Sequence, residues 1–496
     1  MTFTLLTHLS SLQILLSITI YLPLLLVALL LITRNHANTR DAISLVIAII
    51  SFCLNCLLYI KLLQGESLYV HLIRMSKDIY IGFYLEKISV VFALLVNFLW
   101  AITTLYAIGY LRAEHDKHQT RFFIFLHLAI MATFGIAYSA NVLSIFFFYE
   151  LLTLATLPLV GHKVNKENIH SFNTYAGVLI STSLLFFVPA ILILYLLFGT
   201  SDFVLNGLFV DKPIAYPVII FGLLLLFIFG ISKTGIMPFH KWLPSAMIAP
   251  TPVSALLHAV AVVNSGAFIL LKIMVFIFGI TFLKGLALIF LPINLIYWIP
   301  CITILWASII ALFQDNLKAR LAYSTIAQLS YIVLAILLFS DTSTLASIVY
   351  IIAHSFAKIT LFFAAGALIA LAHKHNVSEL GGVGKQMPIV MVTFSIGVLS
   401  IIGLPLTVGF TGKWFVIRSI IESKHLIILL VMIISTILNA LYLMPVVFNA
   451  FFGKPKEEQP HHYKTSMPIN IALCITALCV ILLFIYSNTL IQLLIN

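Results

Sequence analysis

The sequence contains very little charge. Only 9% of its 496 residues are Asp, Glu, Lys or Arg, whereas 62% are hydrophobic, and the mean hydropathy is +1.15. A soluble core does not need so much apolar sequence, so the composition excludes an ordinary soluble fold. The basic residues outnumber the acidic ones by 27 to 16, but they stand singly between apolar runs and form no patch with aromatic residues. This pattern argues against a nucleic-acid partner.

Cysteine is also scarce. Of the five cysteines, Cys53 and Cys56 form a C-x-x-C, but it lies in an apolar stretch without a second pair or a nearby histidine. Packing is the favoured interpretation, and neither a metal site nor a bound cofactor is expected. The sequence has no G-x-G-x-x-G and no flavin-type signature, so a redox step would have to occur on other subunits. Because the N-terminus lacks a charged segment and a cleavage site, residues 14–33 are expected to be a retained helix.

Long apolar runs dominate the chain. With roughly 20 residues needed for each crossing, they predict an all-α, multi-pass membrane protein of about fourteen transmembrane helices. No linker divides the chain, so residues 1–496 are expected to form a single membrane domain, and an extra half-crossing at 279–298 would change the count by one. The runs are 14–33, 42–63, 90–110, 121–138, 141–160, 172–198, 215–236, 252–278, 296–314, 321–340, 343–372, 388–421, 426–452 and 467–494.

The basic residues in the loops predict an orientation. If the N-terminus is outside, the inner loops hold 15 Lys and Arg residues and the outer loops hold 8. Inner loops are usually the more basic ones, so this orientation is favoured. The count leaves the opposite orientation open.

Two apolar runs carry a lysine beside a helix break. Lys233 lies in FGLLLLFIFGISKTGIMP, and Lys413 lies in the run 388–421. An ammonium group in hydrocarbon costs about 2.5–3.5 kcal/mol, so it persists mainly where it lines a polar cavity or has a partner. Two interrupted hydrophobic segments, one in each half of a chain, indicate a transport site near the membrane midplane. The residues expected to break the helices are Gly235, Pro238, Gly403, Pro405, Gly409 and Gly412.

Glu150 is the one carboxylate deep inside an apolar run, and Lys233 is its expected partner. A capping or interface role is the alternative, but nothing needs capping in the middle of a helix. At a separation of ~7 Å and an effective dielectric constant of ~20, the two charges would attract each other by roughly 2.4 kcal/mol. Movement of Glu150 toward or away from Lys233 would therefore hold or release a proton on the amine.

Further ionisable residues follow in later apolar runs. His258, His354 and Lys358 precede Lys413, and together they predict a route for protons. Because His354 and Lys358 are four residues apart, they share one face of a helix and can exchange a proton. For each histidine, a packing role is the alternative.

Two other residues and one segment receive less specific predictions. His127 is equally consistent with packing and with function. Lys272 is expected to extend outward from the end of its helix. The segment 239–248 is expected to lie along the inner interface of the membrane, anchored by Trp242 and Lys241.

Several motifs, in order, resemble those of a known family. The strings FYELLTLATLPLVGHK, KTGIMPFHKWLPSAMIAPTPVSALLHA, DNLKARLAYSTIAQLSY, AHSFAKITLFFAAG and GLPLTVGFTGKW are similar to the antiporter-like subunits of respiratory complex I and of Mrp-type cation/proton antiporters. The resemblance runs from about residue 90 to 450. It implies two inverted five-helix repeats, helices 4–8 (121–278) and 9–13 (296–452), with broken helices 7 and 12. Residues 1–110 would hold helices 1–3, and residues 467–494 the last helix.

The resemblance also implies roles for particular residues. Glu150, Lys233 and Lys413 match the family's key charged positions. His258, His354 and Lys358 match its central polar axis. One departure is Asn264, where the family often has a lysine. An asparagine holds a water but takes no proton at neutral pH, so the route at this point would depend on His258 or on water.

Three functions remain compatible with the sequence, and a fourth, a purely structural membrane scaffold, is hard to reconcile with so many buried ionisable groups. The favoured one is a D-type subunit of an Mrp-type antiporter, which exchanges Na⁺ or K⁺ for protons. The alternatives are a proton-pumping subunit of a complex I-like or hydrogenase-like machine, and a coupling subunit of an inorganic-carbon uptake system. Each predicts other membrane subunits and lipid as partners, in a prokaryotic-type cytoplasmic (inner) membrane.

Overall fold

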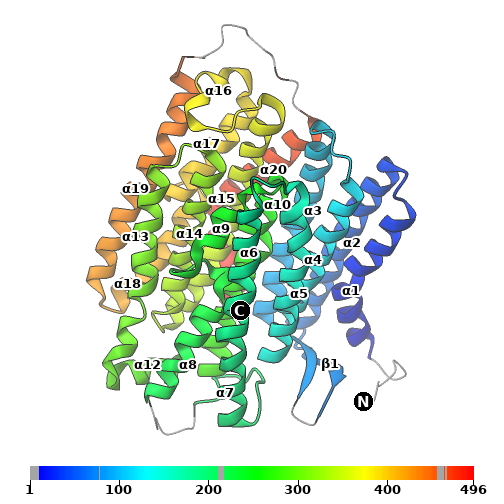
Figure 1. Ribbon diagram of the computed structural model, residues 1–496. Coiled ribbons are helices and arrows are strands. Elements are labelled where there is room, and N and C mark those ends of the chain that lie inside the picture. The colour runs from blue at the N-terminus through cyan, green and yellow to red at the C-terminus, as the bar shows by residue number, and fades with distance from the viewer. Residues whose placement is uncertain (1–9, 77–78, 211–216, 455–462, 464–465, 496) are drawn as a thin grey trace.

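The protein is a bundle of closely packed helices whose axes are roughly aligned with one another (Figure 1). This computed structural model describes residues 10–76, 79–210, 217–454, 463 and 466–495. Within these ranges, twelve helical segments are long and apolar enough to cross a membrane. The predicted class, an all-α multi-pass membrane protein, is confirmed.

Nine of these segments are single α-helices. They are α1 (Ser11–Ile32), α2 (Ala37–Leu63), α3 (Lys87–Ala113), α4 (Gln119–Tyr138), α5 (Val142–Val160, continued by the 3-10 turn η1, Gly161–Lys163), α14 (Leu317–Ile336), α15 (Asp341–Ala372), α19 (Leu426–Phe452) and α20 (Met467–Ile485).

Three other segments combine helix types. They are Ile169–Phe198, made of α6 (Ile169–Thr182), η2 (Ser183–Phe187) and α7 (Val188–Phe198); Thr251–Phe278, made of α10 (Thr251–Ala255), η6 (Leu256–Val260), α11 (Val262–Ile273) and η7 (Met274–Phe278); and Leu291–Leu312, made of η8 (Leu291–Leu295) and α13 (Trp298–Leu312).

The shorter helices include the two runs that were expected to be broken. The first is α8 (Pro217–Gly230), followed by η3 (Ser232–Thr234). The second is α17 (Pro388–Ile402), followed by α18 (Val408–Glu422). The others are η4 (Phe239–Lys241), α9 (Trp242–Ser245), η5 (Ala246–Ile248), α12 (Ile280–Ile289), η9 (Val377–Glu379), α16 (Val383–Gln386) and α21 (Ser487–Ile495).

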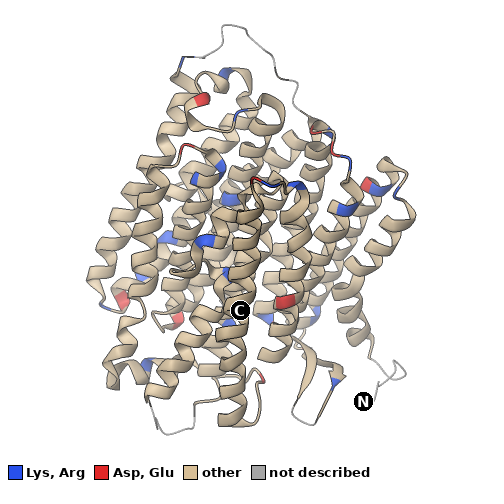
Figure 2. Ribbon diagram, viewed as in Figure 1, with Lys and Arg blue, Asp and Glu red and all other residues tan. Residues whose placement is uncertain are grey.

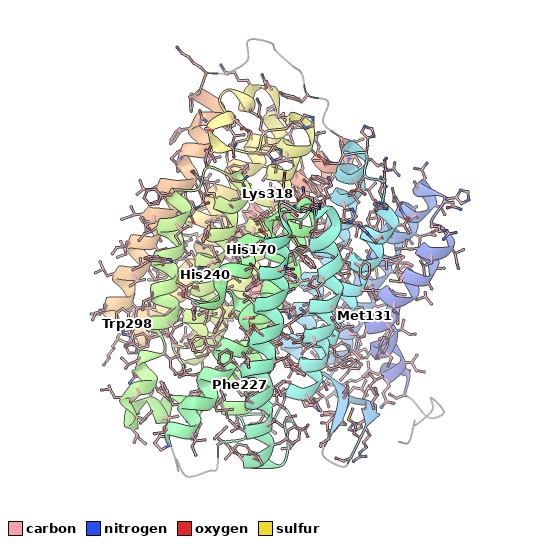
Figure 3. The ribbon with its side chains drawn as sticks, in the orientation of Figure 1. Met131, His170, Phe227, His240, Trp298 and Lys318 are labelled. Atoms are coloured by element: carbon pink, nitrogen blue, oxygen red, sulfur yellow. The ribbon has the colours of Figure 1, made fainter. Side chains whose placement is uncertain are left out.

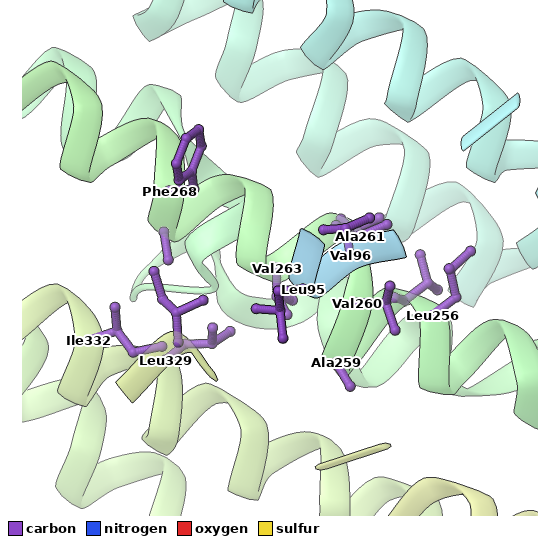
Figure 4. Close-up of a cluster of buried hydrophobic side chains, with 14 of the residues drawn as sticks. Leu95, Val96, Leu256, Ala259, Val260, Ala261, Val263, Phe268, Leu329 and Ile332 are labelled. Atoms are coloured by element: carbon purple, nitrogen blue, oxygen red, sulfur yellow. The ribbon is translucent and has the colours of Figure 1, made fainter. Parts of the chain in front are cut away.

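The centre of the bundle is formed by three segments that are almost completely buried. The segments Thr251–Phe278, α14 and α15 are each 89% buried over their most apolar window, whereas α1, α2 and α20 are 33% buried. Their central position lets these segments bury residues on all sides, polar ones included. Figure 4 shows part of this core, where Val263, Leu95 and Leu329 come from three segments far apart in the sequence.

A β-hairpin lies at one end of the bundle and was not predicted. Strands β1 (Leu68–Arg74) and β2 (Tyr80–Leu85) pair antiparallel. Both are rich in aromatic and β-branched residues, which favour strands. Burial, together with a hydrogen bond from its hydroxyl to Asp202 (2.5 Å), raises the pKa of Tyr80 to about 12. The hydroxyl therefore stays protonated and attaches the hairpin to the segment before α8. We call this end of the bundle the hairpin face.

The segment 239–248 does not lie along a membrane interface as predicted. Figure 3 shows His240 about midway between the two ends of the bundle. Lys241 is exposed, but Trp242 is completely buried and its indole N–H donates to the main-chain oxygen of Ser232 (2.9 Å). The buried indole of Trp242 therefore contacts the turn that follows α8, and the prediction that it anchors the segment at an interface was wrong.

Candidate functional site

Charged residues occur inside the bundle as well as at its ends (Figure 2). The first is Lys233, in the short turn η3 that follows α8, and its side chain is completely buried. The chain turns away at Gly235, whose φ of +69° favours glycine. On the other side, α11 packs so closely that a Cβ at Gly266 would lie 2.7 Å from the carbonyl carbon of Lys233. Glycines at both places therefore fix the position of the lysine.

The ammonium group of Lys233 points at α5. Its Nζ donates to the main-chain oxygen of Tyr149 (3.0 Å) and to Oγ1 of Thr153 (2.6 Å), and lies 3.0 Å from the centre of the Tyr149 ring. Tyr149 and Thr153 are four residues apart, so they stand on the same face of α5. Two oxygens and an aromatic ring thus solvate a buried cation.

Glu150 lies beside this contact but does not form the expected ion pair. The described residues include no salt bridge between Glu150 and Lys233, although the two charges interact electrostatically. One step along α5 from Tyr149 turns the carboxylate about 100° away from the lysine. Glu150 is half-buried, and its Oε1 is buried without a hydrogen-bond partner among the described residues. A rotation of this side chain would change the field at Lys233.

The two histidines lie at the centre of the bundle. His258 is in the π-helical turn η6 and His354 is in α15, and both are buried. The ring of His354 lies close to the main chain of His258. Among the described residues, however, neither histidine has a well-formed hydrogen bond at its ring nitrogens. Asn264 on α11 donates to Ser355 Oγ (2.7 Å). Asn264 therefore links the helix that packs on Lys233 to the helix that carries His354.

Lys358, one turn after His354, contacts α14. Its Nζ donates to Ser324 Oγ (2.7 Å) and to the main-chain oxygen of Leu321 (3.2 Å). The hydroxyls of Ser324 and Tyr442 are hydrogen bonded at 2.9 Å, which continues the contact to α19.

Hydroxyl and amide groups extend this contact along α14 and α19. The hydroxyl of Tyr442 donates to Asn439 (2.6 Å), which accepts from Gln328 (3.4 Å), and Tyr331 donates to Ser435 (2.6 Å). We call these side chains the polar ladder: Ser324, Gln328 and Tyr331 on α14, and Ser435, Asn439 and Tyr442 on α19. We did not predict it, but its signal is in the sequence. Each set has the spacing i, i+4, i+7, which places polar groups on one face of an apolar helix.

Lys413 lies at the far end of the polar ladder. Its Nζ donates to the main-chain oxygen of Ile402 (2.9 Å) and to Thr436 Oγ1 (3.3 Å), and it lies 5.3 Å from the Tyr331 ring centre. Ile402 is the last residue of α17, where Gly403 has a φ of +85°. A cation at the carbonyl end of a helix is electrostatically favoured. The second break thus positions Lys413.

Two glycines allow α18 to pack this closely. A Cβ at Gly409 would collide with the main-chain oxygen of Ser400, and one at Gly412 would lie 2.6 Å from the Tyr350 ring. Only glycine fits at these crossings. The expectation that they interrupt the helix was inexact: the interruption is residues 403–407, and Gly409 and Gly412 lie inside α18.

We predict that Gly409→Ala destabilises the protein by about 1–3 kcal/mol or more, because the added methyl group has no space. The thermal midpoint of the detergent-extracted protein, measured by fluorescence-detected gel filtration, should fall. Gly222→Ala in α8 is the control, since nothing lies within 4 Å of its Cβ position. An unchanged midpoint for Gly409→Ala would contradict the tight crossing.

Two remaining predictions concern His127 and Lys272. His127 is buried, and its Nδ1 accepts a hydrogen bond from the Trp100 indole (3.2 Å), which favours packing. Lys272 does not extend outward. It is completely buried, and its Nζ lies 2.6 Å from the Glu86 carboxylate. The helical segment continues through η7 to Phe278, so Lys272 is not at its end.

Comparison with known proteins agrees with this architecture. The family model for the transmembrane region of NADH:quinone oxidoreductase and Mrp antiporters matches residues 139–439. A second model, for the N-terminus of complex I chain 5, matches residues 73–123. The first match covers more than half of the chain.

Two curated relatives have names from one kind of complex. The chloroplastic NAD(P)H-quinone oxidoreductase subunit 5 of Chara vulgaris is 30% identical over 399 residues, which are 77% of this chain and 58% of that protein. The NADH-quinone oxidoreductase subunit L of Pseudomonas aeruginosa is 28% identical over 401 residues, 79% of this chain and 63% of that protein. The chain thus spans less than two thirds of the length of either relative.

Two solved structures have the same fold. A chain of the membrane-bound sulfane sulfur reductase, an archaeal respiratory membrane complex, superposes with a TM-score of 0.85 at 20% identity, over 96% of both chains. A chain of the Mrp complex from Dietzia sp. DQ12-45-1b gives 0.84 at 16% identity, over 98% of this chain and 96% of that one. Both belong to multi-subunit membrane assemblies. This chain belongs to the NADH:quinone oxidoreductase/Mrp antiporter transmembrane family.

Proposed function

We propose that this chain is a proton-translocating membrane subunit of a complex I-like NADH:quinone oxidoreductase. The names of its curated relatives support this alternative over the Mrp-type antiporter that the sequence favoured. Electron transfer would occur on other subunits. The proposed location is a cytoplasmic (inner) membrane, with residues 121–278 and 296–452 as the two repeats and further membrane subunits as neighbours.

One observation supports the proposal most strongly. Five proton-carrying side chains are buried in the bundle: Lys233, His258, His354, Lys358 and Lys413. Ionisable groups are rare inside membrane segments and usually mark routes for ions or protons. Asn264 and the polar ladder supply hydrogen-bonding groups between them. A scaffold would have no need of such a series.

The geometry suggests how a proton would move along it. When Glu150 turns toward Lys233, its negative charge stabilises the ammonium form. When Glu150 turns away, Lys233 donates its proton through water to an unpaired nitrogen of His258 or His354, and becomes a neutral amine. The imidazolium then protonates neutral Lys358. The hydroxyl groups of the polar ladder, with water bridging the amides of Gln328 and Asn439, pass a proton on to Lys413. Each step transfers one proton and leaves the donor ready to be recharged.

The test compares two driving forces in inverted membrane vesicles that contain the assembled complex. We expect acidification of the vesicle lumen, followed by quenching of a ΔpH-sensitive dye, when NADH is oxidised. We expect no change of the luminal pH in either direction when Na⁺ or K⁺ is added without NADH. Glu150→Gln should remove the acidification while the chain remains in the membrane.

Proton movement driven by Na⁺ or K⁺ alone would overturn this proposal in favour of the Mrp-type antiporter. That second candidate is supported by the likeness to the Mrp complex chain over nearly its whole length. The two functions share the same buried groups, so only the driving force separates them.

A further inference from the structure

The hairpin face contains a cavity that the proposed route does not use. Its volume is about 570 Å³, and Tyr69, Glu86, Lys87 and Phe203 are among the residues that line it. The loop charges predict that this face is the outer one. The cavity thus places a carboxylate and an amine at an opening on the side where a pump would release protons.

A buried ion pair lies at the inner wall of this cavity. Lys272 Nζ is 2.6 Å from Glu86 Oε1, with side-chain exposures of 0% and 10% respectively. Lys272 also donates to the main-chain oxygen of Ser139 (2.9 Å) and lies 4.5 Å from the Phe203 ring centre. The lysine is therefore sealed inside the bundle, whereas the glutamate reaches the cavity.

One face of α11 connects this pair with the proposed route. Asn264, Phe268 and Lys272 are spaced four residues apart, so they lie in a row over roughly 12 Å of helix. Asn264, at one end, is hydrogen bonded to Ser355, the residue after His354. Lys272, at the other end, forms an ion pair with Glu86. Only Phe268 separates the two polar groups along this row.

Phe268 forms a narrow apolar constriction. Its ring stacks on Phe92 of α3, with centres 4.2 Å apart and planes 7° from parallel. Both rings line a crevice of only about 10 Å³, which shares Ile88, Val91 and Ile348 with the outer cavity. This volume is about that of a single water probe, so the constriction does not hold a continuous column of water. The crevice also includes Ile351, one turn before His354 on α15.

We propose that the row on α11 is a proton exit, with the Phe92–Phe268 pair as its gate and Glu86 as its terminal acceptor. This inference rests on the proposed function. The proton held at Lys413 returns through the polar ladder and Lys358 to His354. When the rings part, water enters the constriction and protonated His354 donates that proton through the water to the Glu86 carboxylate. His354 becomes neutral and Glu86 becomes a neutral acid. Lys272 stays an ammonium, and Glu86 then releases the proton to water in the cavity.

The test measures NADH-driven proton transport in vesicles that contain the full-length chain in its complex. Glu86→Gln keeps the shape and the hydrogen bonding but cannot carry a proton, and should lower transport at least about tenfold. Lys61→Met with Glu66→Gln is the matched control. This ion pair (3.2 Å) lies close to the hairpin in sequence but is exposed, so transport should be unchanged.

A second variant separates the exit from a purely structural ion pair. The double variant Glu86→Leu, Lys272→Met replaces the buried ion pair with two apolar side chains. Replacements of this kind usually preserve folding. If the pair only holds α3 to α11, this variant should pump normally. If Glu86 accepts the proton, the variant should assemble in normal amounts, measured by native gel, and fail to pump.

A third variant tests the gate. Phe268→Ala should let an imposed pH gradient decay faster without NADH, whereas Phe268→Leu should maintain the gradient.

Normal pumping by Glu86→Gln and by the double variant Glu86→Leu, Lys272→Met would overturn the proposed exit. If Lys233→Met abolishes pumping in the same experiments, the proposed function stands and only the exit is wrong. If Lys233→Met also pumps normally, the proposed function itself fails.

Discussion

Lys233→Met should abolish NADH-driven proton transport while leaving the fold intact. Methionine fills nearly the same volume as the lysine stem, and a buried apolar side chain avoids the desolvation of an ammonium. Loss of a positioned proton carrier lowers rates by roughly 10²–10⁴-fold. We therefore expect the rate of proton transport to fall about 10²-fold or more, whereas the thermal midpoint of the protein should be unchanged or raised.

The measurement combines dye quenching in vesicles with thermal gel filtration of the extracted protein. Lys61→Met is the matched control, because this lysine is exposed and its side-chain ion pair lies outside the route. Lys233→Arg should fail as well, since a guanidinium stays charged and cannot release its proton. Wild-type pumping by Lys233→Met would remove the lysine from the route and contradict the proposal.

Composition predicted the parts of this site that depend on the membrane environment. Lys233, His354, Lys358 and Lys413 were recognisable because a polar group in an apolar run is costly wherever the run is buried. All four are buried in the structure. The membrane class followed from the same reasoning, since hydropathy and length determine which segments can cross.

Contacts between distant segments were beyond such reasoning. Lys272 was expected to extend outward because the sequence does not reveal Glu86, which lies 186 positions earlier, as its partner. Trp242 was assigned to an interface because its buried hydrogen bond to Ser232 depends on how the break after α8 folds. For Glu150, the predicted partner is nearby, but one helical step directs the carboxylate elsewhere. In each case a tertiary contact outweighed the local pattern.

The polar ladder is intermediate between these cases. The serines, tyrosines, glutamine and asparagine on α14 and α19 are individually ordinary in a membrane helix. Their common spacing of i, i+4, i+7 on two helices becomes informative only when the helices are neighbours. The structure shows that they are, through hydrogen bonds between Tyr331 and Ser435 and between Ser324 and Tyr442.

Lys358→Met should stop proton transport as completely as Lys233→Met, because Lys358 is where the histidine pair meets the polar ladder.

Tyr442→Phe should slow proton transport without stopping it. It removes the hydroxyl that joins Ser324 to Asn439 and leaves the ring in place. The lost hydrogen bond should lower stability by only about 1 kcal/mol, whereas transport should fall about tenfold or more if the hydroxyl relays protons.

Tyr106→Phe is the matched control for Tyr442→Phe. Tyr106 is also completely buried, and its hydroxyl donates to the main-chain oxygen of Phe363 (2.8 Å), outside the polar ladder. The two variants should lose similar stability, but only Tyr442→Phe should slow pumping. Equal transport in both would mean that protons bypass the polar ladder, and that α14 and α19 only hold Lys358 and Lys413 in place. A loss confined to Tyr442→Phe would establish the hydroxyls themselves as the connection between the two lysines.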